Sequence, residues 1–369
     1  MADGITIFMC GDVMTGRGID QILPHPSGPA IHEPFMKSAL GYVELAEQAH
    51  GPIPRPAGFS YIWGDALGEF GRAAPDVKII NLETSVTRSA DYEEKGINYR
   101  MHPDNIPCLT AAGIDCCALA NNHVLDWGVS GLKETLATLK NAGLAGCGAG
   151  ENVREASAPA VMGTARGRVL VFSMGSVTSG IPRGWAAGED RPGVNLLEDF
   201  SYGKILALKE KMEKHPRREG DIVIASIHWG ENWGYDVPEE MRRFAHLLID
   251  EAGVDVIHGH SSHHPRGIEV HGGKLILYGC GDFINDYEGI SGYEEFRGEL
   301  GLMYFAKADP ADGKLISLRM TPTIARRFRV NRVAPSDALW LRDILTREGR
   351  RFGTRVRAGA DGRLDLEWE

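Results

Sequence analysis

The stretch Ile5-Thr-Ile-Phe-Met-Cys-Gly-Asp12 decides how the chain folds. A short apolar run of this length predicts a buried β-strand, and here the run ends directly in the polar pair Gly11-Asp12. Amphipathic segments such as Leu132–Ala142 predict helices between such runs. Strands that alternate with helices predict a layered α/β fold. Other apolar runs that end in a polar cluster are Val77–Ile80, Ile114–Leu119, Ile222–Ile227, Val254–Ile257 and Leu275–Tyr278.

The polar clusters at the strand ends predict one shared site. In open α/β sheets the functional residues gather at the carboxyl ends of the strands, where loops from several strands meet. The clusters combine carboxylate, amide and imidazole groups, which suit Ca²⁺, Mn²⁺, Fe²⁺ or Zn²⁺, and the lack of thiolates disfavours a structural zinc site. The residues concerned are Asp12, Glu83, Asn122, His123, Asp126, His228, His260, His263 and Asp282.

Composition narrows the class of protein. The 369 residues carry 40 Lys and Arg against 50 Asp and Glu, a net charge of −10, which disfavours a nucleic-acid partner and an anionic membrane surface. The first ten residues do not resemble a signal peptide, and no apolar run approaches the length of a membrane span. We therefore expect a cytoplasmic protein. The six cysteines show no CxxC spacing, so buried free thiols are expected.

The order of the motifs resembles the CapA-type (PGA_cap) branch of the calcineurin-like metallophosphatases. The resemblance extends from about residue 5 to residue 290 and implies a four-layer αββα sandwich of two mixed β-sheets flanked by helices. We expect residues 1–322 to form this metallo-domain and residues 323–369 to add a strand, a helix and a hairpin packed on it. The motifs are Gly11-Asp12, Asn81-Leu-Glu83, Asn121-Asn122-His123, His228-Trp-Gly230, Gly259-His260-Ser-Ser-His263 and Gly281-Asp282-Phe.

The resemblance also implies roles for individual residues. His123 stands at the position of a non-ligand acid/base imidazole, and Asp126 is placed to orient it. Two departures, Asp12-Val-Met14 without a histidine and Asn81-Leu-Glu83 without a bridging aspartate, weaken the two-metal arrangement that phosphoryl transfer uses. We expect one divalent ion or a loosely held pair, with Ca²⁺ or Mn²⁺ ahead of Zn²⁺, and no organic cofactor. The implied metal ligands are Asp12, Glu83, Asn122, His228, His260 and His263.

Acid/base chemistry on a peptide is the leading functional hypothesis. Two imidazoles, each oriented by a carboxylate, can remove and return a proton at a Cα that a metal-bound carbonyl has acidified. His123 with Asp126 is one such pair; His260 or His263 with Asp12 or Asp282 is the other. The resemblance extends to the lasso-peptide epimerases of this branch, which implies epimerisation at the C-terminal residue of a ribosomal precursor peptide. The catalytic candidates are His123, Asp126, His263 and Asp12.

Other functions remain open on the sequence alone. One is a poly-γ-glutamate-type amide-bond enzyme or a metallophosphoesterase, and another is a non-catalytic peptide-binding protein with a structural metal. The sequence leaves the oligomeric state open. The basic run Arg326, Arg327, Arg329 and Arg332 is interpreted as a solvated face, with an anion contact as the alternative. The candidates for contact with a peptide substrate are Arg100, Trp127, Arg183, Trp229, Arg266 and Asp282.

Overall fold

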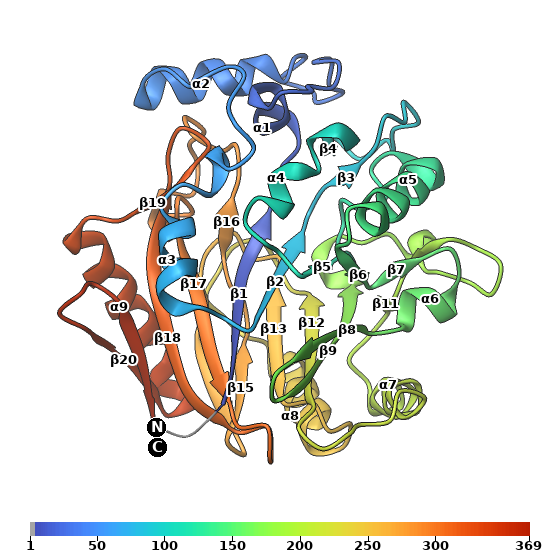
Figure 1. The fold of residues 1–369 in the computed structure, drawn as a ribbon, viewed down its shortest axis with the longest axis vertical. Coiled ribbons are helices and arrows are strands. Elements are labelled where there is room, and N and C mark those ends of the chain that lie inside the picture. The colour runs from blue at the N-terminus through green and yellow to red at the C-terminus, as the bar shows by residue number, and fades with distance from the viewer. Residues whose placement is uncertain (1–3) are drawn as a thin grey trace.

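Two mixed β-sheets form the centre of the computed structural model, which describes residues 4–369 (Figure 1). The first sheet runs in the order β20 (Thr354–Ala358), β21 (Leu364–Trp368), β18 (Leu315–Ala325), β17 (Leu300–Ala308), β1 (Ile5–Val13), β2 (Val77–Leu82), β5 (Cys116–Ala118) and β6 (Ala145–Cys147), with β16 (Asp282–Ile284) beside β1 and β19 (Val330–Arg332) beside β18. The second runs β11 (Leu196–Leu197), β9 (Gly167–Ser176), β12 (Ile222–His228), β13 (Val256–His260), β15 (Lys274–Leu277) and β14 (Ile268–His271), with β8 (Ala160–Thr164) beside β9.

Helices cover the outer faces of both sheets (Figure 1). On the first sheet lie α3 (Ala66–Ala73), α4 (Pro107–Thr110) and α5 (Gly128–Asn141), while α1 (Arg17–Ile22) and α2 (Leu40–His50) lie beyond the upper ends of its strands and join the same core. On the second lie α7 (Tyr202–Glu213) and α8 (Glu239–Asp250). The short α6 (Val153–Ser157) packs beside β7 (Ala149–Gly150), which pairs with β10 (Gly193–Val194), while β3 (Ser85–Val86) pairs with β4 (Arg100–Met101). Helix α9 (Pro335–Gly349) contacts β14, β18 and β20.

Burial on both faces explains why the strands read as continuous apolar runs. Along β1, Ile7 and Met9 enter the core between the sheets, whereas Phe8 and Cys10 enter the core beneath the helices. Successive side chains of a strand point to opposite faces, so both faces of β1 must be apolar. The same alternation holds along β12. The structure thus has the four-layer αββα architecture that the resemblance implies.

Several predicted boundaries were wrong by a few residues. Strand β13 continues to His260 instead of ending at Ile257, so His258 and His260 lie in the strand. Strand β18 runs through residue 322, where the expected metallo-domain was to end, and its partner β21 makes the C-terminal residues part of the first sheet. The predicted helix and hairpin near the C-terminus are present as α9 and the β20–β21 pair. All six cysteines are free and buried, as expected.

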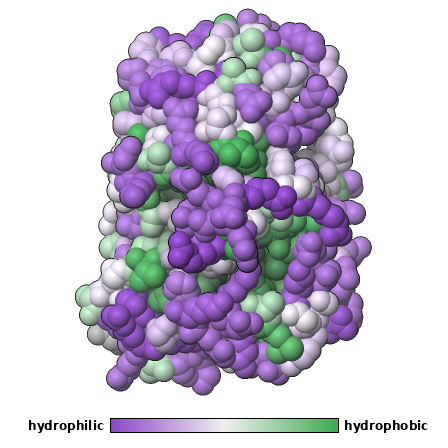
Figure 2. Space-filling view, turned by 90° about the vertical axis from the view of Figure 1, so that its right-hand side faces the viewer, coloured by the Kyte–Doolittle hydropathy of each residue, from purple (hydrophilic) through white to green (hydrophobic). Residues whose placement is uncertain are grey.

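The surface is mainly hydrophilic on the face that carries α5, α6 and α7, and hydrophobic side chains appear there mostly in hollows (Figure 2). Across residues 4–369, no helix has the length and apolar character needed to cross a bilayer.

Strands β1 and β16 approach each other closely at Gly11 and Gly281. A Cβ added at Gly11 would lie 1.5 Å from the carbonyl oxygen of Gly281, which is rigid backbone. We expect Gly11→Ala to lose about 3 kcal/mol of unfolding free energy in urea titrations, the upper end of the usual cost of crowding a packed interior, because the contact is with backbone. The control is Gly163→Ala on β8, where nothing lies within 4 Å of the new Cβ. Equal unfolding midpoints for the two variants would contradict the conclusion that the Gly11–Gly281 contact leaves no room for a side chain.

Candidate metal centre

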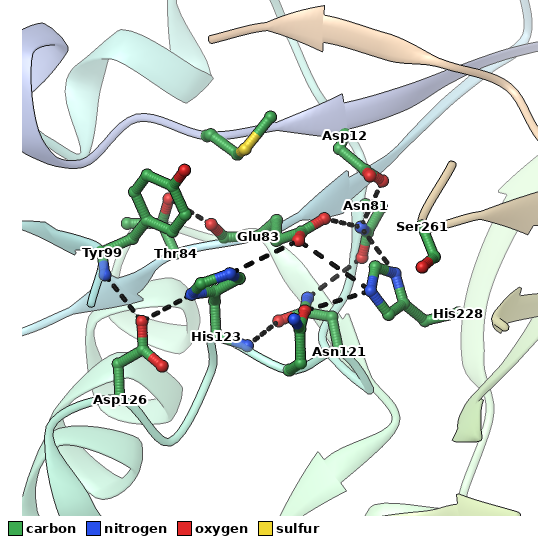
Figure 3. A network of polar contacts seen from close by, with 12 residues as sticks. Asp12, Asn81, Glu83, Thr84, Tyr99, Asn121, His123, Asp126, His228 and Ser261 are labelled. Carbon is green, nitrogen blue, oxygen red and sulfur yellow. Dashed lines mark hydrogen bonds and ion pairs between the residues drawn. The ribbon is translucent and has the colours of Figure 1, made fainter. Parts of the chain in front are cut away.

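The candidate metal centre lies at the carboxyl ends of the parallel strands β1 and β2 of the first sheet and β12 and β13 of the second. Asp12 on β1 is in register with Asn81 on β2 and with Asp282 on β16, and His228 on β12 is in register with His260 on β13. The side chains at these positions are polar, whereas those along the rest of the same strands are mostly apolar. The fold therefore brings the sequence-distant clusters to one place (Figure 3).

Asp12, His228 and His260 form the tightest group of potential ligands. One ligand atom from each lies within 4.8 Å of the others, and all three side chains are buried. The Nδ1 atoms of His228 and His260 are 2.8 Å apart. Asp12 Oδ2 accepts no hydrogen bond from any residue in the described range 4–369. A buried carboxylate oxygen without a donor is costly, and a cation between these groups would satisfy it.

Two further oxygen donors border this group. Asn122 Oδ1 lies 3.1 Å from His228 Nε2, and Glu83 Oε1 lies 3.9 Å from the same nitrogen. Asn81 lies between the carboxylates, and its Nδ2 donates to Asp12 Oδ1 at 2.8 Å and to Glu83 Oε2 at 3.1 Å (Figure 3). These bonds leave Asp12 Oδ2 without a donor among residues 4–369 and Glu83 Oε1 near the nitrogens of His123 and His228. Carboxylate, amide and imidazole donors are a set that divalent cations accept, so the residues fit a metal ion.

His263 and Asp282 form a second group that shares Asp12 with the first. His263 Nδ1 and Asp282 Oδ1 are 2.9 Å apart, and Asn285 Nδ2 donates to the other Asp282 oxygen at 2.8 Å. Between His260 and His263 the chain turns at Ser261, whose φ of 98° is rare for a residue with a side chain. Of the pairings that the sequence left open, the structure contains His263–Asp282. His260 instead contacts His228 and Ser226.

His123 and Asp126 form the imidazole–carboxylate pair that the resemblance implies. His123 Nδ1 lies 2.6 Å from Asp126 Oδ2, which also accepts a hydrogen bond from the Tyr99 backbone N–H (Figure 3). Lys95 Nζ lies 2.7 Å from the second Asp126 oxygen. These contacts fix the ring, and His123 Nε2 lies 3.8 Å from Glu83 Oε1 at the edge of the metal group. His123 is thus oriented for proton transfer beside the centre.

Burial and like charges oppose ionisation of the carboxyl groups. Burial, with the charge of Asp282 added, raises the pKa of Asp12 to about 7. Burial, with Asp12 added, raises the pKa of Glu83 well above its usual range. Burial lowers the pKa values of His228 and His260, so both imidazoles are neutral and have lone pairs to offer. A bound cation would replace protons on these carboxyl groups, which is the electrostatic condition for a metal site.

The two carboxylate-backed imidazoles differ in their proton affinity. Burial lowers the pKa of His123 to about 4, against the opposing effect of Asp126. Burial is the largest single effect on His263 and lowers its pKa, but the charge of Asp282, its hydrogen bond and the charge of Asp12 together raise the pKa above the usual value. Environments that shift the pKa values of two titratable groups in opposite directions are typical of acid/base sites.

Comparison with known proteins shows the family of the chain. The family described as bacterial capsule synthesis protein PGA_cap matches residues 6–287. The chain belongs to this family. It is 48% identical over 367 residues to a protein of Mycobacterium tuberculosis named probable polyglutamine synthesis accessory protein, covering 99% of this chain and 96% of the relative. It is also 27% identical over 286 residues to the PGA biosynthesis protein CapA of Bacillus subtilis, covering 77% of this chain and 64% of that relative.

The substrate-contact candidates of this PGA_cap protein are scattered. Trp229 is fully buried in the core beneath α7 and α8, and its indole N–H donates to the Tyr278 carbonyl, so its selection as a substrate contact was wrong. An aromatic residue next to a motif histidine points to the opposite face of the strand, which explains the error. Asp282 is at the centre itself.

The arginines and Trp127 have partners of their own. Arg100 lies over the Trp127 ring at 3.9 Å, and the Trp127 indole N–H donates to the Tyr99 carbonyl. Arg266 donates to the carbonyl of Glu231. Arg183 is exposed and lies 3.9 Å from Glu198. Their contact with a substrate stays a prediction.

Several residues of the PGA_cap centre were missed as site residues. Asn81 was recognised as part of a motif, but its role between two carboxylates was not, although its place at the end of β2 was a usable signal. His258 lies behind the centre, where Ser226 links it to His260. Lys95 comes from a loop without any periodic pattern, so no sequence signal marks it.

We expect loss of a ligand to abolish metal-dependent stabilisation. Mn²⁺ at 100 times its Kd should raise the unfolding free energy of the unaltered protein by about 2.7 kcal/mol, because the ion binds only the folded state. His228→Ala should show almost none of this increase in thermal or urea unfolding. The control is His102→Ala, a histidine that belongs to none of the groups of potential metal ligands found in residues 4–369. Equal stabilisation of the two variants would place the ion elsewhere.

Proposed function

We propose that this PGA_cap protein is a metal-dependent enzyme that acts on the amide bonds of a polyglutamyl chain. The observation that carries the proposal is the buried group Asp12, His228 and His260 with the oriented His123 at its edge. Relatives named for polyglutamine synthesis and for PGA biosynthesis support the substrate class. Of the functions considered from the sequence, the amide-bond alternative accounts best for both observations together.

The chemistry divides between the ion and the side chains. A divalent ion at this centre would polarise an amide carbonyl and acidify a nucleophile. His123, neutral because burial lowers its pKa, can take up a proton, while Asp126 fixes its tautomer and stabilises the charge that forms. His263 beside Asp282 can give a proton to the leaving amine. His263 thereby keeps both roles proposed for it, because it also belongs to a group of potential ligands that includes Asp12.

The donor set favours Mn²⁺ among the expected ions. Ca²⁺ prefers a shell of oxygen ligands, whereas two imidazoles with carboxylate and amide oxygens suit Mn²⁺. Zn²⁺ accepts the same imidazoles, although this set contains no thiolate. The proposal includes no organic cofactor.

Epimerisation at a peptide Cα is the second candidate. The observation that favours it is the presence of two carboxylate-backed imidazoles, His123–Asp126 and His263–Asp282, with opposite pKa directions. Such a pair can remove a proton from one face of a carbon and deliver one to the other face. A ribosomal precursor peptide would then be the substrate, and the Cα of its C-terminal residue would be inverted.

A single incubation in D₂O separates the candidates. The metal-loaded protein is incubated with γ-linked polyglutamate and, in parallel, with a precursor-type peptide and a phosphoester. We expect the polyglutamate chain length to change without deuterium at Cα, because amide chemistry leaves the Cα–H bond intact. Deuterium uptake at Cα without a change in length would instead support epimerisation, and phosphate release would support a phosphoesterase. No change in polyglutamate with Mn²⁺, Ca²⁺ or Zn²⁺ would refute the proposal.

We expect His123→Ala to lower kcat by about 10²–10⁴-fold, the usual contribution of a general base. Metal content should stay unchanged, since His123 is outside the group Asp12, His228 and His260. The matched control is His271→Ala, which removes another imidazole paired with a carboxylate, that of Asp250 at 3.0 Å. Rates measured on chain-length change should be normal for the control. A fully active His123→Ala enzyme would move the base role to another residue.

A further inference from the structure

A cavity of about 350 Å³ adjoins the candidate metal centre. Asp282, Asn285 and Tyr287 belong to its lining, and Asp282 is the partner of His263 in the centre. The far side is formed by the loop around η5 (Glu294–Phe296) and by the end of β18. A molecule held in this cavity would therefore reach the metal centre past Asp282.

Aromatic rings form one wall of the cavity. Trp233 and Tyr293 both line it, and their rings are stacked with centroids 4.2 Å apart and planes 8° from parallel. Trp233 also lies 5.3 Å from the ring of His263, so the wall leads from the cavity to the centre. The faces of such rings attract cations.

The charges of the lining are of two kinds. Glu294 and Glu299 are exposed carboxylates, and each has one oxygen, Oε1, in a contact with Gly292 N–H or Arg297. Glu288 is different, because its oxygens contact His50 and the Phe328 backbone N–H. Arg326 lines the same cavity, and its guanidinium has neither a hydrogen bond nor an ion pair within residues 4–369. The cavity thus offers anionic and aromatic groups for a cation and one guanidinium for an anion.

We propose that this cavity binds an α-amino-acid head group, with its ammonium toward Glu294, Glu299 and the aromatic wall and its carboxylate toward Arg326. The inference rests on the proposed function for its natural ligand. In a γ-linked polyglutamyl chain only the residue at the amino end has a free ammonium and a free carboxylate on the same carbon. Charge-assisted bonds to both groups would select this end over the interior of the chain.

Recognition of the head group determines which bond reaches the centre. With the terminal residue in the cavity, its own side chain, which carries the first γ-amide, is directed past Asp282 toward His263. The enzyme would therefore act from the amino end of the chain. Interior amides, which lack the ammonium, would leave the two glutamates without a partner.

Binding of two probes tests the proposal without a need for turnover. Calorimetry on the Mn²⁺-loaded full-length protein compares γ-linked triglutamate with its N-acetyl derivative. We expect acetylation to weaken binding by about tenfold or more, since it removes the charge-assisted bonds and the cation–π contact. Glu294→Gln and Arg326→Gln should each weaken binding of the free-amino probe by about fivefold or more. Glu294→Gln should have no effect on the acetylated probe.

Neighbouring residues provide matched controls. Glu295→Gln and Arg327→Gln change the same charges one position away, outside the cavity lining, and should alter affinity less than about twofold. Equal affinity for both probes, or equal effects of Glu294→Gln and Glu295→Gln, would overturn the inference while leaving the polyglutamyl function intact. Glu294-dependent binding of free alanine without binding of either triglutamate would support the head-group site and refute the polyglutamyl function.

Discussion

The contact between Gly11 and Gly281 is the constraint on which the centre depends. Any side chain at Gly11 would collide with the Gly281 carbonyl, and Gly281 itself has a φ of 79° that favours glycine. Because the two backbones touch, β1 and β16 hold Asp12 and Asp282 side by side. Two buried carboxylates in register repel each other, and a bound cation would relieve this repulsion. The same backbone contact that forms the centre therefore favours a cation there.

The electrostatics of the centre follow from this juxtaposition. Burial lowers the pKa of both imidazoles. At His263 the charge of Asp12 adds to that of Asp282 and the pKa rises, whereas at His123 the charge of Lys95 opposes that of Asp126 and the pKa stays low. The asymmetry therefore comes from what surrounds each imidazole–carboxylate pair and not from the pairs themselves. A proton acceptor and a proton donor on opposite sides of one metal group can catalyse several reactions on a peptide. Identifying the reaction therefore requires analysis of its products as well as the geometry of the centre.

Much of the fold and the centre could be predicted from the chain because strand ends are marked by polar residues after apolar runs. Asp12, His228, His260 and His263 carry that mark, and they converge. Which carboxylate pairs with His260 or His263 could not be predicted, because the pairing depends on the turn at Ser261 and on the strand register. Trp229 was misjudged because it directly follows His228, and neighbouring residues of an extended chain point to opposite faces of the sheet. Lys95 could not be found because it comes from a loop whose sequence has no periodic pattern.

The sheet order has a consequence for where this protein can be divided. The family match ends at residue 287, yet β17, which begins at Leu300, is the antiparallel neighbour of β1, and β18 follows it. A chain cut after the matched segment would leave β1, the strand that carries Asp12, with an unpaired edge and would uncover part of the core between the sheets. The segment that the family match covers is therefore structurally incomplete, because strands from the last 80 or so residues finish the sheet that begins with β1.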